Sequence, residues 1–132
     1  MITACDWGRT PSKERFEKNA HIIIPAKAKI LRDEYQDMGS DYAIYYSIKL
    51  PQSALDAFVI SIKRSDYYND TVSRQRATDY TMFKGKNGDK AVWRKSSQGY
   101  KFYKRNGEIN FTEYNIDLDT TSGVVSFKEA AN

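Results

Sequence analysis

The sequence predicts an α+β domain: a single antiparallel sheet of about six or seven strands with one main helix packed on one face. Three observations predict this class. Residues 42–50 alternate apolar and mixed side chains, which is the period of a strand with one buried face. From Ser53 to Arg64 the apolar residues recur at helical spacing. After residue 80, short alternating segments are separated by glycine-containing turns, as in an antiparallel meander.

The strand and helix of residues 42–64 are the clearest unit of the chain. Pro51 ends the strand because it has no N–H to donate to a neighbouring strand. Ser53 is expected to cap the helix, and Lys63 and Arg64 suit its carboxyl end. One stripe of the helix is apolar and is predicted to pack on the sheet. Its members are Leu55, Phe58, Val59 and Ile62.

The segments before this unit are less regular. Residues 12–20 are predicted to form a short helix with Phe16 as its one apolar anchor. Residues 22–24 are an apolar run that we interpret as an edge strand or a packed extended segment. Residues 28–35 are predicted to be a strand that pairs with the central one, and a helix over residues 26–36 is the alternative.

The segments after this unit begin with a long polar connection over residues 65–80. The dipeptide Asn106-Gly107 is the strongest hairpin signal. A change in the parity of apolar positions near Thr112 and Glu113 predicts a β-bulge. The predicted strands are 80–84, 91–95, 100–105, 109–118 and 124–128, and the predicted turns are 85–88, 96–99 and 120–123.

Composition narrows the function classes. A chain of 132 residues is expected to form one domain, and no apolar run approaches the roughly 20 residues that span a bilayer. His21 is the only histidine, and the sequence has no phosphate-binding glycine loop, nucleophile elbow or Cys/His metal spacing. We therefore predict that the protein is not an enzyme and has no catalytic residues, cofactor or metal. The acidic side chains near the first hairpin are interpreted as solvated turn residues. These are Asp33, Glu34, Asp37 and Asp41.

The amino-terminal residues Ile2-Thr3-Ala4-Cys5 suggest a location. They resemble the lipobox of bacterial lipoproteins, in which an aliphatic residue and two small residues precede a cysteine that is lipid-modified. The family pattern also has a charged start and an apolar segment before the lipobox, whereas only Met1 precedes it here. The resemblance implies a lipid anchor at Cys5, a tether over residues 1–20, a domain over residues 21–132 and a place in the cell envelope. The alternative is an exposed cysteine on a cytosolic protein.

Charge is distributed unevenly along the second half of the chain. Residues 84–105 carry eight basic residues and one acidic residue, and residues 106–132 carry one basic and five acidic residues. One interpretation is that oppositely charged neighbouring strands pair. The other is a basic binding surface in which aromatic residues are interleaved with cations. Its predicted residues are Trp93, Arg94, Lys95, Tyr100, Lys101, Tyr103, Lys104 and Arg105.

These observations lead to an expected function class. We expect a non-enzymatic envelope lipoprotein whose domain binds a protein or an envelope component, and an immunity or inhibitor protein is one form by analogy. The alternative is a cytosolic nucleic-acid-binding domain that uses residues 93–105. We expect nucleic acid to be the less favoured partner, because an exported protein meets its partners in the envelope.

Overall fold

The structure is a computed structural model that describes residues 10–69, 83–84, 90–107 and 111–131. Within these ranges the chain forms two helices and a single seven-stranded antiparallel sheet, in the strand order β1-β2-β7-β6-β5-β4-β3. In chain order the elements are α1 (Ser12–Ala20), β1 (Lys29–Met38), β2 (Asp41–Lys49), α2 (Gln52–Arg64), β3 (Phe83–Lys84), β4 (Lys90–Lys95), β5 (Gly99–Asn106), β6 (Thr112–Asp119) and β7 (Val124–Ala131). The predicted fold class is confirmed.

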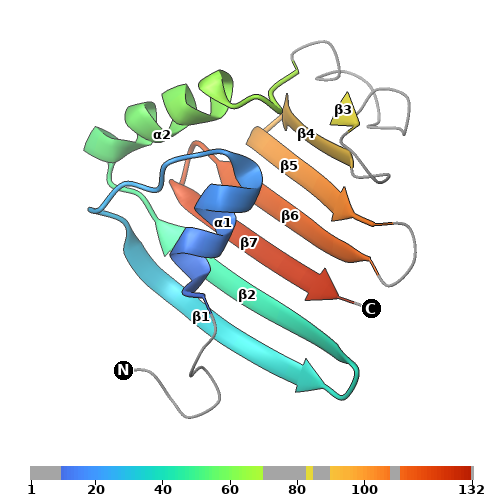
Figure 1. Ribbon diagram of the computed structural model, residues 1–132. Coiled ribbons are helices and arrows are strands. Elements are labelled where there is room, and N and C mark those ends of the chain that lie inside the picture. The colour runs from blue at the N-terminus through green and yellow to red at the C-terminus, as the bar shows by residue number, and fades with distance from the viewer. Residues whose placement is uncertain (1–9, 70–82, 85–89, 108–110, 132) are drawn as a thin grey trace.

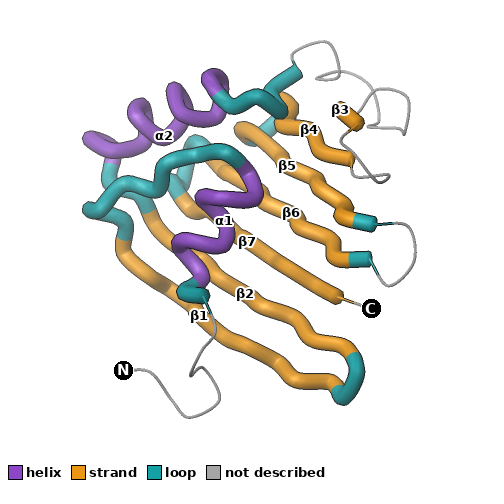
Figure 2. Tube along the Cα trace, viewed as in Figure 1, coloured by secondary structure: helices purple, strands orange, loops and turns teal. Residues whose placement is uncertain are grey.

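Both helices lie on the same face of the sheet (Figures 1 and 2). The core lies between them and this face, where Ile44, Ile48, Leu118 and Val125 have no exposed surface. We call the other face, on which no helix of the described residues lies, the open face. Antiparallel sheets commonly have one face packed on the core and the other in contact with solvent.

The predicted strand and helix at the centre of the chain are β2 and α2. Leu55, Phe58 and Ile62 of the predicted stripe are buried, and Val59 is partly buried against them. The predicted cap at Ser53 is wrong, because the helix begins at Gln52, its N-cap is Pro51, and no side chain caps it. Proline supplies the extended backbone that leads into a helix without donating a hydrogen bond.

Helix α1 is part of the folded domain, whereas the predicted tether extended to Ala20. Phe16 is fully buried and packs against Tyr46 and Phe127 of the sheet, at ring-centroid distances of 6.1 and 4.9 Å. Arg15 binds both carboxylate oxygens of the fully buried Glu129, at 3.0 and 2.5 Å. The packed domain therefore includes Ser12–Ala20, because the side chains of Phe16 and Arg15 both attach this polar helix to the sheet.

Residues 22–24, between α1 and β1, form a packed extended segment, which was one of the two interpretations of this apolar run; the other was an edge strand. Ile22 and Ile24 are buried, and Ile23 between them is exposed. The predicted strand that follows is β1, an exposed edge strand with a register shift between Ile30 and Arg32. The structure therefore contains a β-bulge in β1. A bulge bends an edge strand and makes it a poorer template for pairing with other chains.

The hairpin between β5 and β6 is confirmed, but its details differ from the prediction. Asn106 pairs with Thr112, so the connection is longer than the two-residue turn that Asn-Gly favours. Pairing continues regularly from Thr112 to Asp119, and the predicted bulge near Thr112 and Glu113 is wrong. The parity change arises because β6 begins at Thr112 and Phe111 precedes it. The predicted turn at 85–88, residues 70–80 of the predicted connection and Cys5 lie outside the described residues.

Candidate binding surface on the open face

The open face carries a straight row of polar side chains, one from each of six adjacent strands. We call this set the cross-strand row. Its members are consecutive pairing partners across the sheet, so all of them project from the same face. From β1 to β4 they are Arg32, Ser47, Ser126, Asp117, Lys101 and Arg94.

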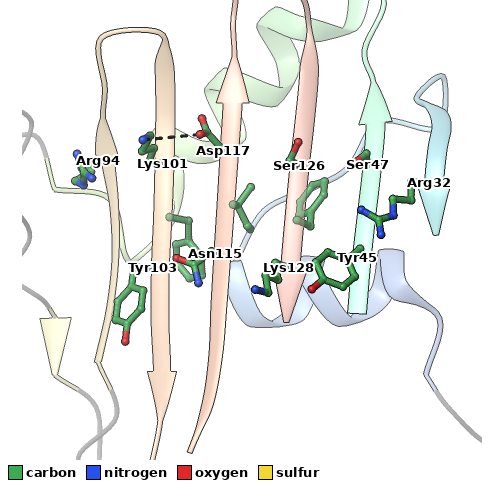
Figure 3. Close-up of a pocket in the computed structure, with 13 residues that line it drawn as sticks. Arg32, Tyr45, Ser47, Arg94, Lys101, Tyr103, Asn115, Asp117, Ser126 and Lys128 are labelled. Carbon is green, nitrogen blue, oxygen red and sulfur yellow. Dashed lines mark ion pairs between the residues drawn. The ribbon is translucent and has the colours of Figure 1, made fainter. Parts of the chain in front are cut away.

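A shallow hollow of about 780 Å³ lies along the cross-strand row. Figure 3 shows these side chains on the open face, together with those of the next row. Small side chains explain the hollow, because Ser47 and Ser126 are next to each other at its centre while longer side chains project on either side. The longer polar side chains that line it from the neighbouring row are Tyr45, Lys128, Asn115 and Tyr103.

The hollow is positively charged. Four cations and one carboxylate line it, which gives a formal charge of +3. Lys101 lies 3.8 Å from Asp117, so this carboxylate offsets one cation. Arg94 and Lys128 have no carboxylate partner among the residues that the structure describes. A ligand with negative charge would therefore meet cations that are not already neutralised.

Arg32 carries the charge at the β1 end of the hollow. Its guanidinium binds Glu34 at 2.7 Å and lies over the ring of Tyr45, 4.4 Å from the centroid. Hydrogen bonds from Arg32 and Gln36 lower the pKa of Glu34, because both stabilise its ionised form. Lys128 approaches the same Tyr45 ring at 5.5 Å. Tyr45 thus orients two cations that line the hollow.

The eight predicted surface residues separate onto two faces of the sheet. Trp93, Tyr100 and Lys104 are buried on the helix-covered face, which corrects their assignment to an exposed surface. The Trp93 indole donates a hydrogen bond to the carbonyl of Ala20 at 2.9 Å, and the Lys104 ammonium donates to the carbonyl of Asn19 at 3.3 Å. Strand alternation alone does not say which face the helices cover, so both faces were equally plausible from the sequence.

Three of the other five predicted residues line the hollow, and they are Arg94, Lys101 and Tyr103. The Tyr103 hydroxyl donates to the carboxylate of Glu113 on β6. Arg105 is opposite Glu113 and lies 3.9 Å from the ring centroid of Phe111. Lys95 is exposed at the end of β4 and pairs with Tyr100.

Oppositely charged strands do pair, as the other interpretation of the charge blocks held. Lys101 is opposite Asp117, and Arg105 is opposite Glu113. Pairing neutralises part of the basic block, but it leaves the hollow with a net positive charge because Arg94 has a lysine as its pairing partner on β5. The pairing of oppositely charged strands is therefore confirmed, and the binding surface stays a prediction.

Sequence reasoning missed the residues that β1, β2, β6 and β7 contribute to the hollow. Ser47 and Tyr45 occupy the mixed positions of the central strand, which the alternation identified only as the less apolar face. Their neighbours on β7, Ser126 and Lys128, are far away in sequence. The alternation of polar residues along each strand indicated which positions share a face. It did not indicate the order of the strands, which brings these positions together.

The acidic side chains near the first hairpin and His21 make contacts within the fold. Asp33 accepts a hydrogen bond from Ser12 at 2.7 Å, and Asp37 accepts one from the amide of Gly39. His21 stacks on Tyr67 and lies 3.5 Å from Asp66. Across the described parts of the chain, no group of three or more His, Cys, Asp or Glu side chains is arranged to hold a metal ion.

Comparison of the chain with protein-family models, with curated proteins and with solved structures gives no significant match. Neither helix in the described ranges has the length and apolar character needed to cross a membrane. The candidate surface therefore rests on the geometry and charge of the open face.

Proposed function

We propose that this protein is a non-enzymatic binding module of the cell envelope, and that its open face is the surface that binds a protein or envelope component. The observation that carries the proposal is the hollow, which gathers polar side chains from six adjacent strands. Binding sites are concave and place a few polar groups on a rigid scaffold. A sheet supported by two helices is such a scaffold.

The chemistry of the hollow favours binding over catalysis. Its lining contains no histidine or cysteine, and its one carboxylate, Asp117, lies beside Lys101. Asp117 is the pairing partner of Ser126, but it lies beside the Lys101 ammonium, and among the described residues no hydrogen bond joins it to the Ser126 hydroxyl. An activated nucleophile needs a general base within hydrogen-bond reach. The proposal therefore assigns the hollow to recognition.

The alternative of a nucleic-acid-binding domain has less support. It relied on aromatic rings for base stacking, and three of the four rings in residues 93–105, those of Trp93, Tyr100 and Phe102, are buried on the helix-covered face. The cations Arg94, Lys101 and Arg105 remain on the open face and could contact phosphates. A surface that has cations but lacks aromatic rings available for base stacking favours a partner recognised by charge and hydrogen bonding.

The envelope location rests on the lipobox-like residues that end at Cys5. It is tested by metabolic labelling with palmitate in cells that produce the natural protein. We expect label in the wild type and none in Cys5→Ser. The genomic codons upstream of Ile2 should also encode a basic start and an apolar segment, and an in-frame stop there would end the lipoprotein proposal.

Site-specific photo-crosslinking tests the binding surface. A benzophenone amino acid at Ser126, in the centre of the hollow, is compared with the same amino acid at Asp56 on the exposed side of α2. We expect one defined adduct from position 126 and none from position 56. Adducts of equal yield from both positions, or from position 56 alone, would refute the assignment of the open face.

A further inference from the structure

We propose that the partner of the hollow is a protein that inserts an extended acidic segment along the cross-strand row, perpendicular to the strands. This inference rests on the proposed function of the open face and adds the chemical class of the ligand. Three observations support it: the distribution of charge along the row, the small size of the side chains between the charges, and the contacts that the aromatic side chains already make.

The cations of the hollow lie in two groups, one on β1 and β7 and the other on β5 and β4. Arg32 on β1 and Lys128 on β7 both approach the Tyr45 ring. Lys101 on β5 and Arg94 on β4 are direct pairing partners in the other group. Asp117 lies beside Lys101, and Glu34 binds Arg32, so each group keeps one cation, Arg94 or Lys128, without a carboxylate partner among the described residues. A ligand that satisfies both groups therefore carries negative charge at two separated points.

The separation of the two groups matches a short extended peptide. Arg32 and Arg94 are five strand spacings apart in the strand order, which at about 4.8 Å per spacing is roughly 24 Å. An extended chain advances about 3.3 Å per residue, so about seven residues span the row. Acidic side chains near both ends of such a segment would reach the two cationic groups.

The middle of the row is suited to a peptide backbone. Ser47 and Ser126 are small, so a chain can approach the sheet closely between the larger side chains. Their hydroxyls, and the amide of Asn115 beside them, can donate to carbonyl groups and accept from N–H groups. A peptide needs both kinds of partner when its backbone is partly desolvated.

The aromatic rings of the hollow favour a polypeptide over single-stranded nucleic acid. Tyr45 is already covered by the Arg32 guanidinium at 4.4 Å and approached by Lys128. Tyr103 directs its hydroxyl to Glu113. Nucleic-acid grooves without sequence preference depend on rings that bases can stack on. Arginine guanidinium groups, by contrast, fit carboxylates in a two-hydrogen-bond geometry.

Fluorescence anisotropy of a labelled octaglutamate peptide tests the ligand class. The peptide is titrated with the full chain at low and at near-physiological salt. The test variant is Arg94→Glu/Lys128→Glu, which reverses two cations that lack a carboxylate partner within the described residues. The matched control is Lys18→Glu/Lys63→Glu, which makes the same change in net charge at exposed positions on the helix side.

We expect salt-sensitive binding that weakens at least about tenfold in the test variant and less than about threefold in the control. Circular dichroism of both variants verifies that they remain folded. Absence of peptide binding, or an equal loss in both variants, would overturn the inference. A short oligothymidylate that binds more tightly than the peptide, and is lost in the test variant, would identify nucleic acid as the ligand and also overturn it.

The crosslinking experiment separates this inference from the proposed function. If the adduct at position 126 forms equally well in Arg94→Glu/Lys128→Glu, the open face binds a partner that is not recognised by its acidic charge, and the inference fails alone. If no adduct forms at position 126, the proposed function itself fails. An adduct that disappears in the double variant supports both.

Discussion

The buried ion pair between α1 and β7 offers the sharpest test of the fold. Glu129 has no exposed surface, and Arg15 binds both of its carboxylate oxygens while the Tyr42 hydroxyl donates to one of them. Arg15→Met removes the cation but leaves the carboxylate buried. Breaking a buried pair in this way costs about 3–5 kcal/mol of unfolding free energy. Because Arg15 is partly exposed, we expect a value near the lower end, about 3 kcal/mol.

The double variant Arg15→Met/Glu129→Met isolates the charge effect. Replacing both partners by apolar side chains leaves no unpaired charge, so we expect the double variant to be more stable than Arg15→Met alone. Urea unfolding measures these free energies, with the fluorescence of the buried Trp93 and circular dichroism as two independent signals. With a urea slope of about 2 kcal/mol per molar, a loss of about 3 kcal/mol lowers the midpoint by about 1.5 M.

Two results would contradict this reasoning. A cost of less than about 0.5 kcal/mol for Arg15→Met is the size expected of a surface substitution, and it would mean that α1 is not docked on the sheet in solution. A double variant that is less stable than Arg15→Met would mean that the carboxylate of Glu129 has other favourable interactions that outweigh its desolvation.

Three further predictions concern other parts of the domain. Phe58→Asp places a charge at a fully buried position and should cost more than about 4 kcal/mol or prevent folding, whereas Ile60→Asp on the exposed side of the same helix should change stability by less than about 1 kcal/mol in urea unfolding. Gly99→Ala should lower the melting temperature, because its Cβ would lie 2.1 Å from the carbonyl oxygen of Leu118, and an unchanged melting temperature would contradict the close packing of β5 on β6. Burial and the Glu129 carboxylate raise the pKa of Tyr42 from 10.0 to about 12, so its stabilising contribution is complete below pH 10 and is lost as the pH rises toward 12. Stability measured across this range should therefore fall less steeply in Tyr42→Phe than in the wild type.

The sequence predicted the parts of the fold that depend on neighbouring residues. The alternation of β2 and the apolar stripe of α2 are local patterns, and burial of Ile48 and Phe58 follows from them. The packing of α1 on the sheet was harder to predict, because the sequence of this helix contains only one large apolar residue, Phe16. Its buried ion pair joins residues that are 114 positions apart, and no local pattern indicates such a contact.

The candidate surface was predicted in part for the same reason. The basic strand β5 was identified, and Lys101 and Tyr103 do line the hollow. The assignment of Trp93 to the surface failed because the covered face is decided by where α1 and α2 pack. Ser47 and Ser126 are unremarkable in the sequence, and they become neighbours in the hollow only because β7 pairs with β2.

The position of β7 between β2 and β6 also determines when the sheet can form. Its pairs with β2 join residues 75 to 89 positions apart, from Lys49 with Val124 to Tyr42 with Ala131. Until β7 pairs with them, β2 and β6 each lack one neighbour, and the two parts of the sheet cannot join. Such distant pairing slows folding and keeps the growing chain open. The sheet therefore closes in one step, when β7 enters between two parts that each have an unpaired edge until then.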